Sequence, residues 1–406
     1  SLALTLMLRF SLLTLLALFP AATLAAQETD ALSLQALSAN DIEVEGLVRF
    51  RGIRRSGDAL FTSDNPHQAE VLARVGLTTN WDAYLSGYLE LDAVAVDAGD
   101  AAEMRLRRGW VDINKLWLDS SMRVGRFDIA FGDERIASSA SWWAETNAFD
   151  GILLDGSGGN MDWSLWASEA RQSVVALGGE GFHGGRVAWE LPEMELETYA
   201  VQLHNGSALS EWTYGLRAAG ETYLGLNWNV HGAMQYGNRG DLRIVANAFA
   251  ADFDYELDGG HHIGLTWQRA SGSEEDGDDR DERFHAPFGD GMRHFGRVAL
   301  GTWSNISAWA LRYRLDWNQR WAMHADFHTF SRDSSDDAFR LGSRAEDSRV
   351  ADTGDLSMAD EIDFYLRGNL TERLDLDFGF TLLRASQDVS NDSTQTMFWL
   401  LTGLRF

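Results

Sequence analysis

Two amino acids are almost missing from this chain of 406 residues: there is no cysteine, and Lys115 is the only lysine among 34 basic residues. The absence of cysteine excludes a disulfide framework, a thiol nucleophile and a lipidated N-terminal cysteine. It suits a protein that crosses an oxidising compartment unfolded. The other 33 basic residues are arginines, which form planar bidentate pairs with carboxylates. Either recognition of carboxylates or a codon bias towards arginine accounts for this excess.

Proline is also scarce, and basic residues are outnumbered. Only four prolines occur, and the three beyond the N-terminal region, Pro66, Pro192 and Pro287, fall between candidate strands. Proline removes a donor from a sheet ladder, so this placement favours an extensive β-sheet. The formal net charge is −27. Because binding to phosphates requires a basic face, the charge argues against a nucleic-acid partner.

Long apolar runs are absent after the N-terminal region. Arg9 precedes the short apolar run 10–19, and Thr23-Leu24-Ala25 follows it. A charged start, a short apolar core and a small residue at a cleavage point predict a secretory signal peptide over residues 1–25. The run is well below the ~20 residues of a membrane-spanning helix. We expect residues 26–41, which are mostly polar, to form a periplasmic segment.

The rest of the chain, residues 42–406, consists of repeated amphipathic segments of ~10 residues, the length of a tilted membrane strand. In 306–316, for example, Trp309 and Leu311 alternate with Arg312 and Arg314. Eighteen such strands are predicted, over residues 42–54, 67–80, 82–95, 104–116, 120–131, 149–156, 161–171, 182–191, 194–205, 212–221, 224–238, 242–256, 261–270, 306–316, 321–331, 358–370, 373–385 and 394–406.

The connections between these segments alternate between short turns and long loops, the latter including 132–148, 271–305 and 332–357. An outward apolar face needs lipid around it, and backbone groups in lipid must all be paired, so the sheet must close. The sequence therefore predicts an all-β fold, a transmembrane antiparallel barrel of about 18 strands. Short turns would face the periplasm and long loops the exterior of the bacterial outer membrane, with lipid and lipopolysaccharide as partners.

The last predicted strand supports this fold. Phe398, Leu400, Leu404 and Phe406 share one parity, so one face of the strand is apolar and it ends on an aromatic residue. This pattern resembles the closing strand of outer-membrane barrels, which the barrel-insertion machinery recognises. We therefore expect that machinery to be a partner.

The opposite parity places charged side chains in the lumen. Acidic and basic residues are similar in number there, so two interpretations stay open: the arginines select anions, or the charges pair across strands and stabilise the wall. The candidate pore arginines are Arg49, Arg51, Arg108, Arg126, Arg312, Arg314 and Arg367.

Other candidate sites lie on the same strands and loops. His324, Asp326 and His328 share one parity, but the two histidines lie ~13 Å apart in an extended strand, too far to bind one metal ion. A polar lumen wall is therefore predicted. The acidic run 274–282 is either a solvated loop tip or a site for a hard cation. No nucleotide or zinc signature occurs, so no cofactor is expected.

Two longer motifs resemble the alginate-export family of outer-membrane porins. The first is Met122-Arg-Val-Gly-Arg-Phe-Asp-Ile-Ala-Phe-Gly-Asp-Glu-Arg135, followed by Phe149-Asp-Gly. The second is Phe284-His-Ala-Pro-Phe-Gly289, followed by His294-Phe-Gly. Ala148 and Ser273 depart from the family pattern. The resemblance implies an eighteen-stranded barrel with an arginine-rich pore for an acidic polysaccharide. It also implies that Arg126, Asp128 and Arg135 lie at or above the constriction, beneath an inward-folded loop 132–148.

The sequence thus predicts a passive outer-membrane channel, rather than an enzyme, for export or uptake of an anionic saccharide, such as an alginate-like polyuronate, or another carboxylate. Three alternatives stay open. They are a general diffusion porin without a specific substrate, an outer-membrane enzyme acting through His324 and Asp326, and a scaffold whose barrel is plugged by a partner.

Overall fold

The computed structural model describes residues 42–56, 67–96, 103–117, 119–139, 147–172, 179–274, 279–299, 301–337, 339–340, 348–349, 356–386 and 394–406. The predicted signal peptide (1–25) and periplasmic segment (26–41) lie outside these residues. Residues 43–406 form one compact unit. No helix in the described ranges has the length and apolar content needed to cross a membrane.

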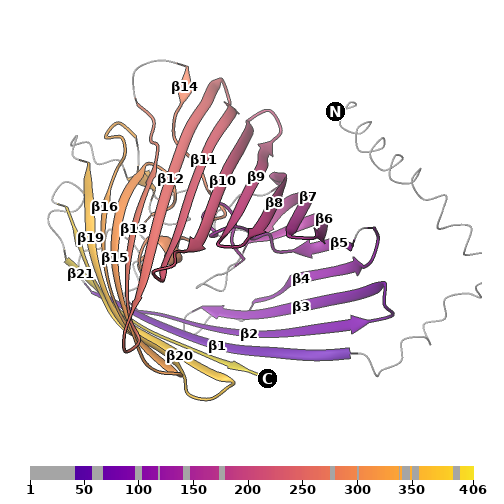
Figure 1. Ribbon diagram of the computed structural model, residues 1–406, viewed down its shortest axis with the longest axis horizontal. Helices are drawn as coiled ribbons and strands as arrows, with labels where there is room; N and C mark the ends of the chain where they lie inside the picture. Colours follow the sequence, from indigo (N-terminus) through magenta and orange to yellow (C-terminus); the bar gives the residue numbers. More distant parts are fainter. Residues whose placement is uncertain are drawn as a thin grey trace, which may run out of the picture. The chain divides into compact units, whose positions relative to one another are not determined.

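Eighteen long antiparallel strands form one closed barrel (Figure 1). Each strand pairs with its neighbour in the chain, and ten residue pairs join β1 to β21 and close the ring. The strands are β1 (Ile42–Ser56), β2 (His67–Asn80), β3 (Leu85–Val96), β4 (Glu103–Ile113), β5 (Ser120–Phe127), β6 (Ala148–Gly158), β7 (Met161–Gln172), β8 (Gly181–Leu191), β9 (Met194–Asn205), β10 (Leu209–Glu221), β11 (Leu226–Arg239), β12 (Leu242–Leu257), β13 (His261–Ala270), β15 (Ile306–Asn318), β16 (Trp321–Ser331), β19 (Ser357–Asn369), β20 (Leu374–Ala385) and β21 (Thr394–Arg405).

Four small elements lie in the described parts of the long connections. The two-residue strand β14 (Arg280–Asp281) pairs in parallel with β12, and β17 (Phe339–Arg340) pairs with β18 (Ser348–Arg349). The four-residue helix α2 (Gly291–His294) is capped by Asp290, whose carboxylate accepts a hydrogen bond from the Arg293 amide. Together with the barrel strands, they confirm the predicted fold class.

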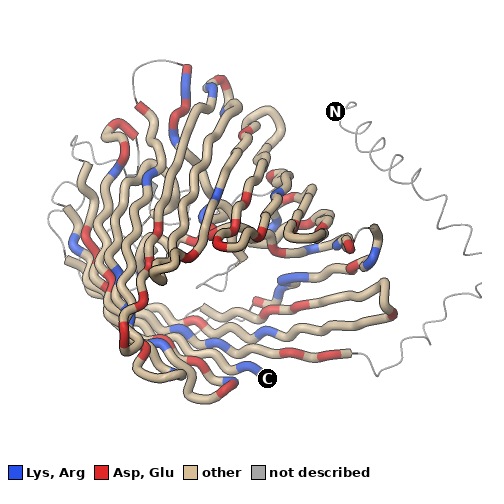
Figure 2. Tube along the Cα trace, in the orientation of Figure 1, with Lys and Arg blue, Asp and Glu red and all other residues tan. Residues whose placement is uncertain are grey.

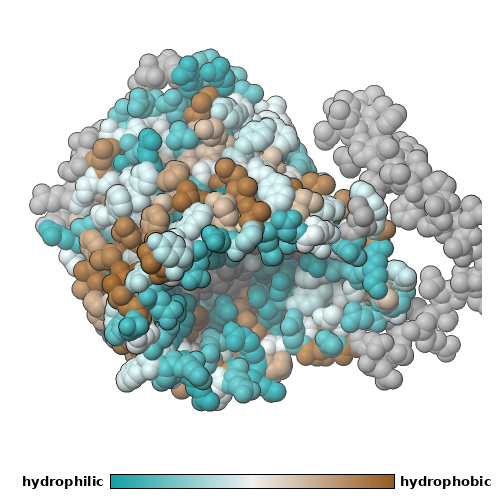
Figure 3. Space-filling view, viewed as in Figure 1, coloured by the Kyte–Doolittle hydropathy of each residue, from teal (hydrophilic) through white to brown (hydrophobic). Residues whose placement is uncertain are grey.

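Alternation of side chains separates an apolar outer face from a charged inner face. On β15, Trp309 and Leu311 are 49% and 52% exposed, whereas Ala308 and Ala310 are buried. On β21, Phe398 and Leu400 face outward, as predicted. Figure 2 shows acidic and basic residues mixed along the strands, and Figure 3 shows a hollow bordered by hydrophilic side chains. Lipid is the environment that suits so apolar an outer surface.

Exposed aromatic residues gather at the short-turn end of the barrel. Trp81, Trp117, Trp317 and Tyr223 are all at least 42% exposed and lie in or beside the short turns. Amphipathic rings prefer the boundary between lipid and water. This belt therefore marks the periplasmic interface, and the long loops lie on the opposite side.

The strand predicted over 120–131 is shorter than expected. β5 ends at Phe127, and the chain then turns into the lumen, where Ile129 and Phe131 are buried. The turn requires Gly132 at φ +59° and Glu134 at φ +66°. Burial of these apolar side chains inside the barrel thus takes the place of the last residue pairs predicted for this strand. The predicted inward fold of loop 132–148 is confirmed for residues 132–139, where Ile136 and Ala137 are buried.

A hydrophobic core fills the lumen at its long-loop end. It joins the β5–β6 loop and the β13–β15 loop to the inner wall. Phe149 and Phe182 of the wall pack against Phe288 of the second loop, with ring centroids 5.1 and 5.0 Å from it. Trp303 is 1% exposed and packs against Phe284. The open part of the lumen is therefore on the periplasmic side of these loops.

Candidate functional site

A buried ion network holds the β5–β6 loop inside the barrel. The Arg135 guanidinium pairs with Asp133 of the same loop and donates two hydrogen bonds of 3.1 Å to Asp252 of β12. His294 Nε2 is 2.8 Å from the Asp133 carbonyl oxygen, which links the two loops. Although burial opposes ionisation, His231 and Arg135 hold the pKa of Asp133 well below its usual value. Burial, followed by Arg135, lowers the pKa of His294 to about 3.

A cavity of about 1270 Å³ lies on the periplasmic side of these loops. Strands β12, β13, β15, β16, β19, β20, β21 and β1 form its wall, residues of the segment 290–297 border it above, and the turn 318–320 borders it below. The chain as a whole is strongly negative, but the cavity lining is nearly balanced in charge, with eight arginines and seven aspartates. These residues are Arg49, Arg293, Arg297, Arg312, Arg314, Arg320, Arg367, Arg405, Asp254, Asp290, Asp316, Asp326, Asp363, Asp375 and Asp377.

Arg312 differs from its neighbours in this cavity. Its guanidinium forms no ion pair with the residues that the structure describes, and its Nη2 atom is buried without a hydrogen-bond partner. By contrast, Arg314 bonds Asp316 at 2.9 and 2.6 Å, and Arg367 bonds Asp377 at 3.0 and 2.8 Å. A buried guanidinium nitrogen without a hydrogen-bond partner is costly. The guanidinium's planar set of donors matches a carboxylate, so Arg312 is the arginine here most ready to bind an anion.

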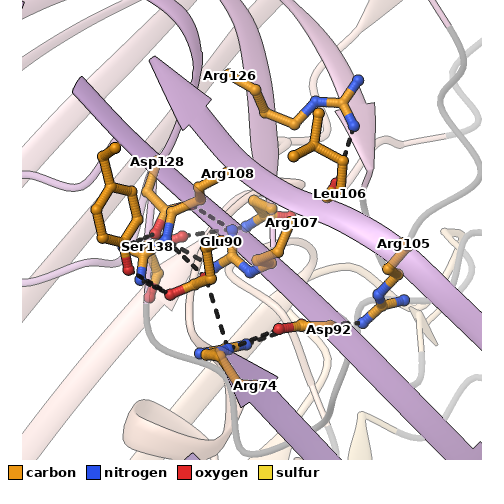
Figure 4. Close-up of polar contacts among 12 residues, drawn as sticks. Arg74, Glu90, Asp92, Arg105, Leu106, Arg107, Arg108, Arg126, Asp128 and Ser138 are labelled. Carbon is orange, nitrogen blue, oxygen red and sulfur yellow. Dashed lines mark hydrogen bonds and ion pairs between the residues drawn. The ribbon is translucent and has the colours of Figure 1, made fainter. Parts of the chain in front are cut away.

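A second cavity, of about 420 Å³, lies beside β1 to β4, and Arg405 lines both cavities. Arg74, Glu90 and Arg108 of its wall take part in ion pairs, which Figure 4 shows. Arg74 bonds Asp92 at 2.8 and 3.0 Å, and Arg108 bonds Glu90 at 2.9 and 2.6 Å. On this side of the lumen the charges pair across strands, as the stabilising interpretation predicted.

A β-bulge turns two successive arginines into the lumen. Arg108 lies opposite Glu90, but the next pair is Leu106 with Leu91, so Arg107 is the extra residue. A bulge shifts the inward parity by one residue. Arg107 is therefore buried, and it bonds Asp128 at 2.6 Å, while Arg108 bonds the same carboxylate at 3.3 Å. Strict alternation starting from Arg108 predicts that Arg107 faces outward, so the inward position of Arg107 was missed. The two adjacent arginines were the signal that the alternation breaks here.

The predicted inward position of Arg126 is wrong. Arg126 shares its parity with Val124, which is 41% exposed on the outer face, while Phe127 points inward into the core. The Arg126 guanidinium bonds Asp150 at 2.7 and 3.0 Å and the Leu106 carbonyl oxygen at 3.0 Å. Figure 4 shows Arg126 and Leu106 apart from the cluster around Asp128. The apolar residues at 122 and 124 already indicated that this parity faces lipid.

Side chains bridge β4 and β5 where their ladder stops. Only five residue pairs join the two strands, from Gly109 with Arg126 to Ile113 with Met122. Beyond them, Arg126 reaches β4 from the outside. Asp128 reaches β4 from the inside through the arginines of the bulge. Asp128 thus lies inside the barrel, but as a link to the wall.

The other predicted residues fall into two groups. Arg135 is only 1% exposed within its ion network, so it anchors a loop and does not line the cavity. Arg51 is equally buried and bonds Glu70 at 2.5 Å. The remaining predicted arginines face inward and line a cavity, so their placement agrees with the parity; a role in substrate binding stays a prediction. They are Arg49, Arg108, Arg312, Arg314 and Arg367.

Sequence reasoning missed a loop arginine that enters the cavity. The Arg297 guanidinium lies 3.9 Å from the centroid of the Tyr365 ring and 3.4 Å from an oxygen of Asp377. His324 stacks on the same tyrosine, with ring centroids 4.3 Å apart. Arg297 follows the second family motif directly, but no periodicity within a loop shows where its side chain points.

The acidic run 274–282 is described only in part, since 275–278 lie outside the described residues. Asp281 pairs with Arg239 of β11. Asp337, in the neighbouring loop, lies 3.3 Å from Arg283. Arginines therefore contact one described acid of the run, Asp281, and one acid of the neighbouring loop, Asp337. Cation binding by the rest of the run stays a prediction.

The closed eighteen-stranded barrel, with a lipid-facing surface and a charged lumen, defines an integral channel protein of the bacterial outer membrane. The chain belongs to the alginate-export family, because the family model described as "Alginate export" matches residues 48–398. No curated protein matches the chain.

Solved structures of Pseudomonas aeruginosa porins share the fold. OpdL has a TM-score of 0.68 at 12% identity, and the match covers 90% of this chain and 99% of OpdL. OpdK, solved with vanillate, has a TM-score of 0.67 at 11% identity, covering 90% and 98% of the two chains. OccK11 (OpdR) has a TM-score of 0.65 at 16% identity, covering 90% and 96%.

Proposed function

We propose that the protein is a passive channel for an anionic saccharide, such as an alginate-like polyuronate, or for another carboxylate. The observation that carries this proposal is Arg312, a guanidinium on the cavity wall whose buried Nη2 atom has no partner. A substrate carboxylate would satisfy this donor and gain a charge-assisted hydrogen bond. On this proposal transport needs no catalytic group, because diameter and charge determine which solutes pass.

The rest of the cavity supports recognition of a chain with repeated charges. Arg297 and Arg367 lie around Tyr365, and Arg405 continues the series into the second cavity. Their acidic partners lower the affinity for an anion, because a carboxylate must compete with them for each guanidinium. Weak binding at several positions suits transport, since a substrate must leave as well as enter.

Planar bilayers containing the purified protein provide the test. An oligouronate should block the current in a concentration-dependent way, whereas a neutral oligosaccharide of equal length should not. The variant Arg312→Gln should weaken blockade roughly tenfold, the loss expected for one charge-assisted hydrogen bond. Arg126→Gln is the matched control, because Arg126 lies on the outer face. Blockade that is equal in wild type and Arg312→Gln would contradict the proposal.

A general diffusion porin is the second candidate. The near balance of eight arginines and seven aspartates around the cavity favours weak selectivity. In that case acidic and neutral oligosaccharides of one size would block the current equally. The same bilayer experiment therefore separates the two functions.

A further inference from the structure

Four inward side chains on two paired strands form a second polar cluster. Asp326 and His328 lie on β16, and Glu361 and Asp363 lie on β19. The register pairs Asp326 with Asp363 and His328 with Glu361. His328 is 3% exposed, and the two acids of β19 are completely buried. Apart from the charges that Asp326 and Asp363 add to the cavity wall, the pore function proposed above uses none of these four groups.

Three of these residues bring ligand atoms close together. One atom each from Asp326, His328 and Asp363 lies within 4.8 Å of the other two. His328 Nε2 and an Asp363 oxygen are 3.8 Å apart. A tetrahedral ion with bonds of about 2.1 Å holds its ligand atoms about 3.4 Å apart. The His328–Asp363 pair would close by about 0.4 Å and a pair at the 4.8 Å limit by up to about 1.4 Å, so side-chain movements of about 1 Å or less on each side close the site.

Glu361 provides an independent sign that a cation would be stabilised here. Its Oε1 accepts a hydrogen bond of 3.0 Å from the Val298 amide, but its Oε2 is buried without a hydrogen-bond partner. The Glu361 carboxyl group lies within hydrogen-bonding reach of the Asp363 carboxylate. A buried carboxylate oxygen with no donor, beside a second carboxylate, is unfavourable in a low dielectric. A positive ion between them would remove this penalty.

The carboxylates are already oriented by hydroxyl groups. The Tyr365 hydroxyl donates to Asp326 at 3.1 Å, and the Thr381 hydroxyl donates to Asp363. Such outer hydrogen bonds hold ligands in position in metal sites. The nearby Arg297 guanidinium contacts Asp377 and Tyr365, and its backbone amide donates to Asp363 at 3.4 Å.

We propose that Asp326, His328 and Asp363 bind one divalent transition-metal ion, with Zn²⁺ the best fit. An imidazole and two carboxylates suit Zn²⁺, whereas Ca²⁺ and Mg²⁺ prefer sites made of oxygen ligands. All three residues line the larger cavity, so an ion reaches them from the lumen. His324, four residues before His328, stacks on Tyr365 and is not a ligand. This inference is independent of the substrate of the channel.

Calorimetry tests the proposal with the untagged full-length protein in detergent, after treatment with EDTA. Wild type should bind one Zn²⁺ per chain, and Co²⁺ should produce a visible absorption band. His328→Gln and Asp363→Asn should each weaken binding at least tenfold. His324→Gln is the matched control, because it changes a histidine of the same strand and the same cavity, and should bind as wild type does.

Folding of each variant is checked by its mobility on a denaturing gel before and after heating, so loss of binding in a folded barrel supports the site. No uptake of Zn²⁺ by wild type up to about 1 mM would overturn it. Equal affinity of wild type and His328→Gln would overturn it too. Binding that is lost in His324→Gln but kept in His328→Gln would place the ion elsewhere and equally overturn the assignment.

Discussion

Arg126 and Asp150 form a bidentate ion pair on the outer face of the barrel, with nitrogen–oxygen distances of 2.7 and 3.0 Å. Arg171 of β7 adds a second contact to Asp150, at 3.1 Å. Both arginines lie near the long-loop end of their strands, where lipid headgroups surround an outer-membrane barrel. The ion pair therefore serves the wall and not the solute path.

Replacing Arg126 should leave the ion selectivity of the channel unchanged. In Arg126→Gln the outer pair with Asp150 is lost, and because the pair is partly exposed, the free energy of unfolding should fall by about 1 kcal/mol or less. Reversal potentials across a salt gradient measure the selectivity. A shift towards cations in Arg126→Gln would mean that this side chain reaches the pore after all.

Arg135 should be far more important for stability than its surface neighbour Arg293. Arg135→Gln removes the cation that Asp133 and Asp252 share, and breaking a buried ion pair costs about 3–5 kcal/mol. Release of the β5–β6 loop should also increase the single-channel conductance. Unfolding by urea in detergent and bilayer recordings measure the two effects.

Arg293→Gln is the matched control, since the Arg293 side chain is 52% exposed and pairs with Glu134 at the loop surface. Its effect on the free energy of unfolding should be below about 1 kcal/mol. Equal losses in the two variants would show that the buried network does not hold the loop.

The stability of the barrel should decrease as the pH falls. His294, with a pKa of about 3, stays neutral in the folded protein, whereas an unfolded histidine binds a proton below about 6.5. The unfolded state therefore binds more protons between these values, and the contribution of His294 to stability is lost as the pH falls from about 6.5 to 3. The lowered pKa of Asp133 acts in the same direction at more acidic pH.

The variant His294→Gln isolates this effect. Between pH 6 and 4 its free energy of unfolding should depend less on pH than that of wild type, by about 1.4 kcal/mol per pH unit at most, which is the value for one proton. Denaturant titrations at several pH values give this slope. Identical slopes would mean that His294 is protonated equally in both states.

Gly296 should tolerate no side chain. It has φ +77°, and a Cβ atom there would lie 2.6 Å from the carboxylate of Glu361. Gly296→Ala should lower the free energy of unfolding by about 1–3 kcal/mol, from backbone strain and the displaced contact. Gly158→Ala is the control, because no atom lies within 4 Å of a Cβ at that position. Equal stability of the two variants in urea would contradict this account.

The fold was largely predictable because alternation, turn length and the placement of proline all depend on local sequence. Seventeen of the eighteen predicted strands end within about three residues of the observed bounds, a deviation normal at strand ends. The exception is β5, whose last residues were predicted to continue the strand. Ile129 and Phe131 instead join a core made with distant loops, a contact that no local pattern contains.

The candidate site was less predictable, because its residues depend on register and on loops. One bulge reverses the alternation, so that Arg107 faces the lumen. For Arg126, the inward face was assigned to the wrong set of alternate residues in the strand, which turns every side chain to the opposite face. The sequence alone argues against a metal site, because His324 and His328 lie too far apart on one strand to bind the same ion. Asp363 enters only through pairing of β16 with β19, which a single sequence does not show.

The ladder between β1 and β21 has a consequence for biogenesis. Gly46 and Phe406 bond each other through their backbones in both directions, at 2.8 and 3.0 Å. One edge of β1 therefore stays unpaired until β21 has been synthesised. Contacts between residues so far apart in the sequence form slowly. Until β21 arrives, β1 presents an open edge that invites aggregation. The nascent polypeptide thus depends on protection of that edge throughout its transit to the membrane.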